Sequence, residues 1–543
     1  MTSSLIRGRP RRATAHISLR VLHTVVGGLA GLVWLVLPWM TISSDMPVPA
    51  TRAHPAAASA AAPQQDGTST VDLVLPLVAV GAAAVVAGYG YVRRTRRART
   101  RTTPGGAPAP AGPHAPPLSE LDERVRVLLA EADDWVRTSR EELGFAEARS
   151  GADSVAPFLR AVRDAESELS AAFRMRQQYD DGVPEDETSR RHALTGMVGR
   201  CQEAGRRLDA EAAGFDLLRA LGTADGLGEA LEVAEGRFRA LAARTAGAGA
   251  TSAGLGRRYG STAVEVVTGH AEQAKDRLVF ATTRLNQARQ AADMGADEDA
   301  ARHLRAAEGA IAQADVFVAG VERLAADLAS AAGLVPAALT GAEAELAAAR
   351  TARTDAGDIS AGELHARAAH ADLVLAAVRD EVTAGPYDPL DALRLIVRGL
   401  GPVGVGREGV LSVAASLVAR SAVAEADAYV MTHRGAVGST ARTRLAEAQR
   451  LLAEEPPELP ATDALARRAR ELAERDVRVR GNPLAGAAEH ESGTAGAVVG
   501  GVLLGPPSEG GPPASFGGPR THVRRAESGS PDQGLRRSPP DRP

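Results

Sequence analysis

Residues 121–136 read LDERVRVLLAEADDWV. The apolar side chains of this stretch recur at intervals of three and four positions, so they lie on one face of a helix: Leu121, Val125, Leu128, Leu129, Ala132 and Val136. Ser119 precedes the stretch as a candidate N-cap, and Asp122 stands where a capping box has a glutamate. The stretch therefore predicts an amphipathic helix that packs its apolar face against other helices.

Further helical patterns follow, separated by Gly, Asp and Pro, and continue to about Arg480. We expect helices over residues 119–147, 155–180, 189–221, 227–245, 262–294, 298–332, 335–351, 360–382, 390–397, 410–433, 439–453 and 462–479. Three pairs of segments repeat a helix, a polar break and a second helix, which predicts helical hairpins: 284–289 with 301–308, 345–350 with 364–369, and 444–449 with 465–470. Residues 119–480 are thus predicted to be one helical, coiled-coil-like region.

The composition favours long helices with thin cores. Hydrophobic residues make up 44% of the chain but aromatic residues only 3%. Alanine dominates the apolar share, and it forms helices readily while burying little surface. The predicted fold class is all-α: a membrane-anchored array of long, Ala-rich helical hairpins. The net charge of −4 does not suggest a nucleic-acid partner. The single cysteine, Cys201, excludes an intramolecular disulfide and a cysteine-cluster metal site.

The first hydrophobic segment follows a basic N-terminus that contains Arg7, Arg9, Arg11 and Arg12. Residues 21–40 are apolar with few interruptions, so residues 1–40 are expected to be a signal peptide or a signal-anchor helix. The segment is longer than a typical signal sequence, yet small residues that a signal peptidase accepts follow at 56–62. Cleavage and retention both stay open. Residues 41–70 are expected to be a short extracytoplasmic loop.

The second hydrophobic segment reads VDLVLPLVAVGAAAVVAGYGYV over residues 71–92. As a helix rising about 1.5 Å per residue, it is long enough to cross a hydrocarbon core of roughly 30 Å. Six arginines follow within nine residues: Arg93, Arg94, Arg96, Arg97, Arg99 and Arg101. By the positive-inside rule they place the following chain in the cytoplasm, and their density also predicts contact with anionic lipid head groups.

The segments that flank the helical region have little apolar surface to bury. Residues 93–118 combine the arginines with a Pro/Gly linker, and residues 481–543 form a Gly/Pro-rich tail. The linker and the tail are predicted to be disordered. We expect the protein in the cell (plasma) membrane, with its C-terminal bulk on the cytoplasmic side.

Motifs that could carry chemistry have weak support. Residues 399–404 match GxGxxG, but no convincing strand precedes them, which favours an interhelical loop. His365 and His370 are five positions apart, not the four that place two histidines on one helix face. The carboxylates of residues 180–187 could attract a divalent cation, but a helix-capping loop fits their spacing better. We expect no catalytic, cofactor-binding or metal-binding site, and we interpret Cys201 as a core residue.

Several longer strings resemble those of a known family. They are YVRRTRRARTRTTPGG at 91–106, ADDWVRTSREELGFAEA at 132–148, RQQYDDGVPEDETSRRH at 176–192 and AGFDLLRALG at 213–222. The chain resembles the membrane-distal part of actinobacterial, Streptomyces-like TPM-domain membrane proteins. The resemblance implies a signal peptide, an extracytoplasmic TPM domain (also called a TPM phosphatase domain), a transmembrane helix, a coiled-coil-rich cytoplasmic region and a glycine-rich tail.

This chain departs from that arrangement between its two hydrophobic segments. Only residues 41–70 lie there, whereas a TPM domain needs well over a hundred, so the TPM domain itself is expected to be missing. The phosphatase activity proposed for that domain therefore cannot be carried over. The tail also lacks the long glycine runs of the family.

These patterns predict a membrane-tethered helical scaffold or protein-interaction module at the cytoplasmic face, and not an enzyme. The expected partners are membrane lipids and either an unidentified protein or a second copy of the chain, bound through helices. The alternative is a degenerate member or an accessory of a TPM-domain membrane protein. Leu285 and Leu304 are expected on apolar helix faces, whereas His303 and Cys201 are expected to be dispensable.

Overall fold

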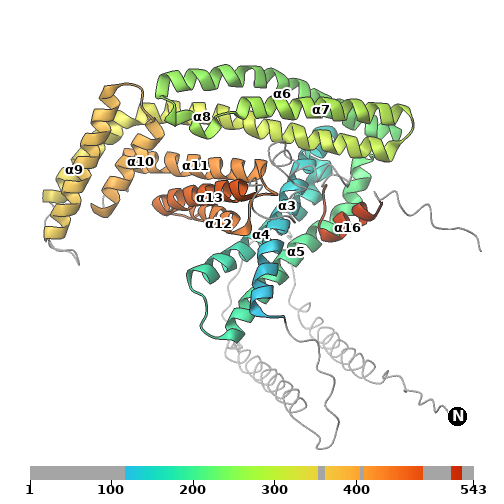
Figure 1. Ribbon diagram of the computed structural model, residues 1–543, viewed down its shortest axis with the longest axis horizontal. Helices are drawn as coiled ribbons and strands as arrows, with labels where there is room; N and C mark the ends of the chain where they lie inside the picture. The colour runs from blue at the N-terminus through green and yellow to red at the C-terminus, as the bar shows by residue number, and fades with distance from the viewer. Residues whose placement is uncertain (1–115, 352–360, 404–408, 481–514, 529–543) are drawn as a thin grey trace, which may run out of the picture. The chain divides into compact units, whose positions relative to one another are not determined.

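The computed structural model describes residues 116–351, 361–403, 409–480 and 515–528 (Figure 1). All regular secondary structure in these ranges is helical, which confirms the all-α fold class. They belong to one compact unit, Pro113–Pro543. The predicted segments 1–40, 41–70 and 71–92, and the arginines of 93–101, lie outside the described residues.

Helices α3 (Leu118–Ser150), α4 (Ala152–Asp181) and α5 (Glu187–Arg219) pack against one another around a common apolar core. The apolar positions predicted for residues 121–136 lie in this core or directly against it: Leu121, Val125, Leu128, Leu129, Ala132 and Val136. The amphipathic pattern of the sequence thus identified the buried face of α3.

The N-terminus of α3 differs from the prediction. The helix begins at Leu118, and Pro117 occupies the N-cap position without a side-chain cap, so the predicted cap at Ser119 is wrong. Asp122 instead pairs with Arg126 four residues on and with Arg176 of α4, at N–O distances of 2.5 Å in both pairs. Its carboxylate joins two helices instead of completing a capping box.

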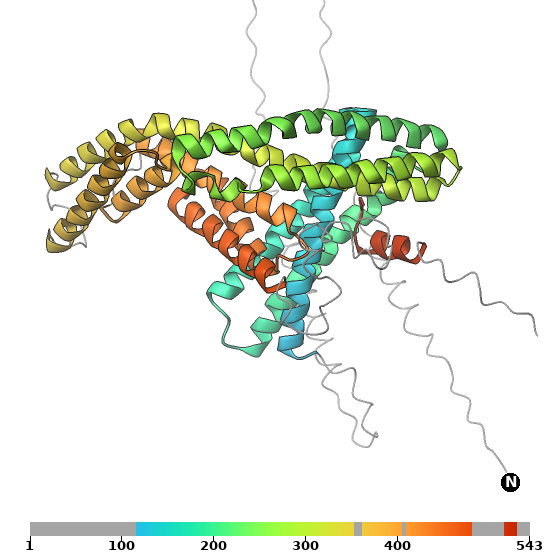
Figure 2. The ribbon, with the colours of Figure 1, turned by 45° about the horizontal axis from the view of Figure 1, so that its top comes forward.

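The central part of the unit shares the largest apolar core. Its elements are α6 (Ala224–Tyr259), η1 (Thr262–Val267), α7 (His270–Asp293), α8 (Asp297–Thr351), α9 (Ala361–Ala384), α10 (Pro389–Leu400), η2 (Gly401–Val403) and α11 (Gly409–Thr432). Helices α6, α7 and α8 lie side by side (Figure 2). Many of the buried side chains are alanines, which allows these long helices to approach closely.

Helix α11 also packs against the last hairpin, α12 (Ser439–Leu452) and α13 (Leu459–Arg480), around a smaller core. The three predicted hairpins are confirmed, because α7 packs on α8, α8 on α9, and α12 on α13. The repeat of a helix, a polar break and a second helix was sufficient to identify these neighbours in the chain.

Three predicted helices differ clearly from the structure. Residues 262–294, predicted as one helix, form η1 and α7 with a break at Thr268 and Gly269. Helix α6 runs on to Tyr259 instead of ending near residue 245, although residues 246–256 are rich in glycine. The burial of Ala248 and Tyr259 in the central core outweighs the low helix propensity of glycine. The break predicted near residue 333 is absent, because α8 continues through Pro336 with Ala331, Val335 and Ala338 buried in the same core.

Part of the tail is ordered, contrary to the prediction of disorder for residues 481–543. Residues 515–518 are buried, and α16 (Pro519–Ser528) packs against α5 (Figure 1). Phe516 belongs to the apolar core of α3, α4 and α5. Composition alone misjudged this segment because one aromatic side chain provides most of its apolar surface.

Two of the described helices, α8 and α11, are long and apolar enough to cross a membrane. This is weak evidence for membrane association, because core helices pass the same test of length and composition. Helix α8 contains the buried Glu308, and both helices contribute side chains to the central core. We therefore describe them as core helices.

Candidate functional site

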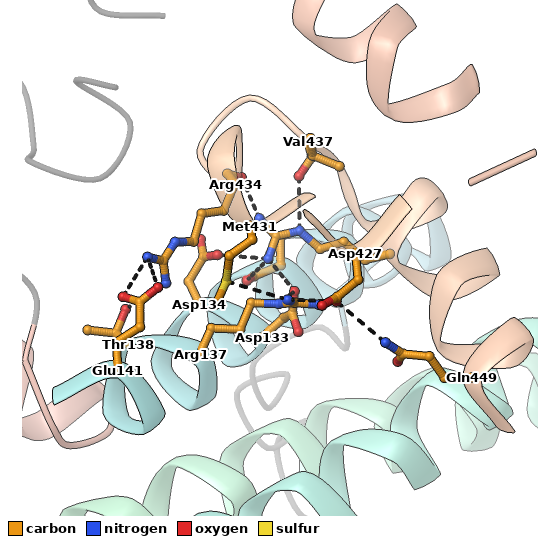
Figure 3. Close-up of polar contacts among 12 residues, drawn as sticks. Asp133, Asp134, Arg137, Thr138, Glu141, Asp427, Met431, Arg434, Val437 and Gln449 are labelled. Atoms are coloured by element: carbon orange, nitrogen blue, oxygen red, sulfur yellow. Dashed lines mark hydrogen bonds and ion pairs between the residues drawn. The ribbon is translucent and has the colours of Figure 1, made fainter. Parts of the chain in front are cut away.

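One face of α3 carries a row of charged residues that meets the C-terminal helices. Asp133, Arg137 and Glu141 follow one another at intervals of four, which aligns them along the helix. Figure 3 shows this row facing residues of α11 and of the loop that follows it, among them Asp427 and Arg434. The row therefore joins parts of the chain that are far apart in sequence.

Arg442 of α12 lies at the centre of this network, and its side chain is 1% exposed. Its Nη1 donates to Asp133 Oδ2 at 2.6 Å and to Asp134 Oδ1 at 2.7 Å. Its Nε donates to the carbonyl oxygen of Val437 at 3.1 Å, and its Nη2 donates to that of Arg434. One guanidinium thus fixes α12 and the preceding loop against α3.

Two further arginines extend the network. Arg137 Nε donates to Asp133 Oδ2 at 2.9 Å, and its Nη1 donates to Asp427 Oδ1 of α11, also at 2.9 Å. Arg434 Nη2 donates to both carboxylate oxygens of Glu141, at 2.8 and 2.7 Å. Arg137 therefore links α3 to α11, and Arg434 links the loop after α11 to α3.

Attraction between opposite charges holds this network together. Burial opposes the charge of Asp133, but the attraction of Arg137 and Arg442 outweighs it and lowers the pKa of that carboxyl. Asp133 consequently stays ionised at neutral pH, where it holds two guanidinium groups and has no proton to give. We call Asp133, Arg137, Glu141, Arg434 and Arg442 the arginine clamp.

A second buried cluster ties α3 and α5 to α8. Arg219 Nη2 donates to both carboxylate oxygens of Glu308, at 2.7 and 2.6 Å, and its Nε lies 3.6 Å from Glu142 Oε1. Arg305 Nε donates to the same Glu142 oxygen at 3.2 Å. Burial raises the pKa of Glu308 although Arg219 opposes this shift. Paired charges of this kind fix the orientation of helices that alanines alone would hold loosely.

The tail segment is held to α5 by the carboxylate of Asp209. Its Oδ1 accepts hydrogen bonds from the N–H of Gly518 at 2.9 Å, the N–H of Thr521 at 3.0 Å and the Thr521 hydroxyl at 2.7 Å. Its Oδ2 accepts one from the N–H of Arg520 at 3.2 Å. The first N–H groups of a helix have no partner within it, so Asp209 caps α16 from outside.

The aromatic ring of Phe516 fills a pocket between α4 and α5. It stacks on Phe215 at a centroid distance of 4.3 Å and meets Phe158 edge-on at 6.0 Å. The side chain is 0% exposed, and its backbone N–H donates to Glu142 Oε2 at 2.6 Å. Residues 516–521 together with this pocket and Asp209 are called the tail-docking site.

A small cavity lies beside His270, lined also by Arg323, Glu425 and Arg470. Its volume is about 30 Å3, which is room for about one water molecule. His270 Nδ1 is buried and has no hydrogen-bond partner among the residues that the structure describes. Burial, with the positive charge of Arg470, lowers the pKa of this histidine to about 4. The cavity is too small for an organic substrate.

The chain is similar to the UPF0603 proteins of two strains of Mycobacterium tuberculosis. Each is 29% identical over 459 residues, which cover 78% of this chain and 67% of the relative. The expected likeness to an actinobacterial protein is thereby confirmed. No family model matches the chain, and this includes any model of a TPM domain. No solved structure matches it either.

The structure places the two singled-out side chains of the helical region in ordinary surroundings. Cys201 is buried in the core of α3, α4 and α5, and burial raises the pKa of its thiol to about 12, so it is a poor nucleophile. His303 is half-buried, and its Nδ1 lies 3.3 Å from Arg284 Nη1. These two residues are not brought together with a catalytic partner in the described part of the chain.

The sequence motifs also fall at helix ends or on surfaces. The first glycine of GxGxxG, Gly399, lies in α10, and η2 (Gly401–Val403) follows, so the described part of the motif lies at a helix end; its last glycine lies outside the described residues. His365 and His370 are exposed on α9. Within the described ranges, no group of three or more His, Cys, Asp or Glu could hold a metal ion.

The acidic loop at 180–187 acts as predicted in capping a helix. Asp186 is the N-cap of α5, and its side chain accepts a hydrogen bond from the N–H of Ser189 at 2.8 Å. Asp180 pairs with Arg176 at 2.8 Å, and Asp181 accepts from Gln177 at 2.8 Å. The carboxylates are therefore used within and between helices.

Sequence reasoning missed the arginine clamp and the tail-docking site. The clamp joins Asp133 to Arg442 across 309 positions, and no local pattern reports such a contact. The tail did contain one usable signal: Phe516 is the only Phe, Trp or Tyr in residues 481–543. A lone aromatic next to two glycines in a polar tail is typical of a binding segment, because it supplies a large apolar contact.

Proposed function

We propose that this protein is a membrane-tethered helical scaffold that acts by binding other proteins, with residues 119–480 on the cytoplasmic side. The proposal rests on the position of α3. Among the described helices it is the first after the predicted membrane span, and it contacts α4, α5, α6, α8 and α12. An anchor joined to α3 would therefore hold the helical unit through a helix that contacts both its N-terminal and its C-terminal helices.

The buried ion pairs support a scaffold because they fix one arrangement of the helices. An ion pair such as Arg442–Asp133 tolerates little change in geometry, since displacement leaves a charge buried without its partner. Alanine side chains are small and alike, so Ala-rich helices by themselves do not select one packing arrangement. A fixed surface is what a binding platform needs, because a partner then loses less entropy on association.

The proposed partners are membrane lipids and a protein. Arg93, Arg94, Arg96, Arg97, Arg99 and Arg101 would contact anionic lipid head groups. The helical unit would bind an unidentified protein or a second copy of the chain. Neither nucleic acid nor a small-molecule cofactor enters the proposal.

The test compares core variants with variants of the reactive side chains in the full-length chain. Leu285 and Leu304 are buried where α7 and α8 pack, so Leu285→Glu and Leu304→Glu should disrupt the helical unit and abolish partner recovery after in-cell crosslinking. Cys201→Ala and His303→Ala should leave sedimentation and partner recovery unchanged. If either alanine variant abolished a cellular function with fold and association intact, a reactive site would replace the scaffold.

The likeness to the UPF0603 proteins, together with the strings at 132–148 and 176–192, favours one alternative. In this reading the chain is a degenerate member or an accessory of a TPM-domain membrane protein. Stable co-purification with a TPM-domain protein of the same cell would favour the accessory role. Phosphate release by the purified chain, lost on a point substitution, would favour an enzyme.

A further inference from the structure

We propose that α3, α4 and α5 carry a recognition site for an extended Phe-Gly-Gly-Pro-x-Thr segment, and that its resident ligand is residues 516–521 of the same chain. The site does not depend on the proposed scaffold function. The proposal rests on the contacts that the segment makes, position by position, with α3, α4 and α5.

The first position requires an aromatic side chain. Phe516 is fully buried between the rings of Phe215 and Phe158, and a smaller residue would leave that pocket partly empty. The segment enters the pocket with its backbone N–H bonded to the buried Glu142 at 2.6 Å. The site therefore recognises an aromatic ring together with the main-chain N–H of the same residue.

The second and third positions require glycine. A Cβ on Gly518 would lie 2.1 Å from the carbonyl oxygen of Gly205 in α5, so the two backbones meet where no side chain fits. Gly517 has a φ of +136°, which L side chains rarely adopt, and its N–H donates to Ser139 Oγ at 3.2 Å. The glycine pair is therefore a condition of docking and not merely a flexible spacer.

Asp209 recognises the remaining positions of the segment, residues 519–521. Pro519 lies at the first position of α16, where its missing N–H is no loss, and the next two N–H groups point at the carboxylate. The Thr521 hydroxyl donates to the same carboxylate and is 1% exposed. A hydroxyl at this position completes the pattern, whereas the Arg520 side chain is exposed and free to vary.

Covalent linkage favours docking within one chain over docking between chains. A ligand joined to its site by a linker has an effective concentration on the order of millimolar. A second copy would have to exceed that concentration to compete. Residues 516–521 should therefore occupy the site of their own chain at ordinary protein concentrations, until a peptide with the same pattern displaces them.

The test is crosslinking within the full-length chain in detergent micelles. Arg206 and Val523 line the same open hollow beside Asp209 and are 59% and 57% exposed, so a double variant, Arg206→Cys with Val523→Cys, suits a short bis-maleimide. The natural Cys201 is buried and should not react. We expect one crosslink within the chain.

Two substitutions should undock the tail without unfolding the helices. Phe516→Ala lies in the tail and should reduce the equilibrium constant for docking about 100-fold. Gly205→Ala places a Cβ 2.5 Å from Pro519 Cδ while raising the helix propensity of α5; the Cβ also lies 3.2 Å from Trp135 Cζ3 of α3, so circular dichroism checks that the helices stay folded. Arg520→Ala, which keeps every backbone contact, is the matched control and should crosslink like the parent.

The outcomes separate the possibilities. Loss of the crosslink in both substitutions, with recovery of binding when a labelled peptide of residues 513–524 is added to the Phe516→Ala chain, supports the site. A crosslink that persists in both, or a peptide that does not bind, overturns it. When chains with Arg206→Cys alone and Val523→Cys alone are mixed, every crosslink joins two chains, so a yield equal to that of the double variant would overturn docking in cis. None of these measurements depends on an external partner.

Discussion

Arg442 is the residue on which the contact between α12 and α3 most depends. It reaches two carboxylates on α3 and two carbonyl oxygens of the loop before α12. Removal of one partner from a buried ion pair leaves the other charge uncompensated, which is worse than replacing the pair as a whole. Removal of the Arg442 side chain should therefore lower the stability more than removal of an ordinary surface arginine.

We predict that Arg442→Met lowers the free energy of unfolding by about 3–5 kcal/mol, because Asp133 stays buried with one fewer partner. Denaturant unfolding followed by far-ultraviolet circular dichroism measures this change. Arg468→Met is the control, since its pair with Glu471 is half exposed on both sides and should contribute below about 0.5 kcal/mol. Equal effects in the two variants would contradict a structural role for the clamp.

We predict that His270 makes the protein less stable in acid. Its pKa is about 4 when folded against a reference of 6.5, so the unfolded chain binds the proton at higher pH. The associated stability is complete above pH 6.5 and is lost as the pH falls toward 4, by up to about 3 kcal/mol. His433, whose pKa burial also lowers, acts in the same direction.

Buried Glu308 and Glu425 oppose this trend, since burial raises their pKa and they favour the folded state as they become protonated. The measurement therefore compares the stability that the parent chain and a His270 variant lose on acidification. The stability lost between about pH 7 and about pH 4.5 should be smaller in His270→Gln than in the parent chain. An identical loss in both proteins would show that His270 is accessible and titrates normally.

Among the helices, α6 shows most clearly how packing overrides local propensity. Its C-terminal third contains several glycines, yet it stays helical because its inner face is buried against α7 and α8. Gly247 lies on the outer face, where an added Cβ would meet no other atom within 4 Å. The helix there bears the entropic disadvantage of glycine without any packing reason for it.

We predict that Gly247→Ala raises the free energy of unfolding by about 0.5–1 kcal/mol. Thermal unfolding followed by circular dichroism measures the change. Gly226→Ala, in the first turn of the same helix, should instead destabilise, because its Cβ would lie 2.4 Å from the carbonyl oxygen of Ala220. A loss of stability in Gly247→Ala would mean that the outer face of α6 is covered.

The sequence predicted the elements better than the contacts between them. Helical periodicity identified the buried face of α3 and the three hairpins, since these depend on neighbouring residues. It failed at the end of α6 and at Pro336, where distant residues supply the packing that decides the boundary. The clamp and the tail-docking site lay beyond its reach, because residues such as Asp133 and Asp209 look like ordinary surface carboxylates in the sequence.

At the scale of the whole molecule, the helical unit is joined end to end. Helix α12 contacts α3, and the tail segment contacts α5, so the last described residues close back on the first helices. The predicted membrane span precedes this closed unit in the chain. The orientation of the span therefore determines on which side of the membrane the unit lies.

We predict that the six arginines between residues 93 and 101 fix that orientation. Their replacement by glutamine should weaken topology control, because the positive-inside rule depends on Lys and Arg next to the span. A reporter fused after Pro117 would move in part to the outer side. Six glutamine substitutions at exposed arginines far along the chain should leave it cytoplasmic: Arg420, Arg467, Arg468, Arg475, Arg478 and Arg480. A strictly cytoplasmic reporter in both proteins would contradict the role of the cluster.

The arginine clamp also affects how the chain is made. Asp133 leaves the ribosome 309 residues before Arg442. At a synthesis rate of about 5–20 residues per second, this corresponds to a delay of roughly 15–60 s. During that interval the apolar face of α3 can pack on α4 and α5, which follow it directly, but its charged row lacks the guanidinium of Arg442. Asp133 and Asp134 therefore stay without this partner until α12 is made, so the contact between α3 and α12 should form late in synthesis or after it.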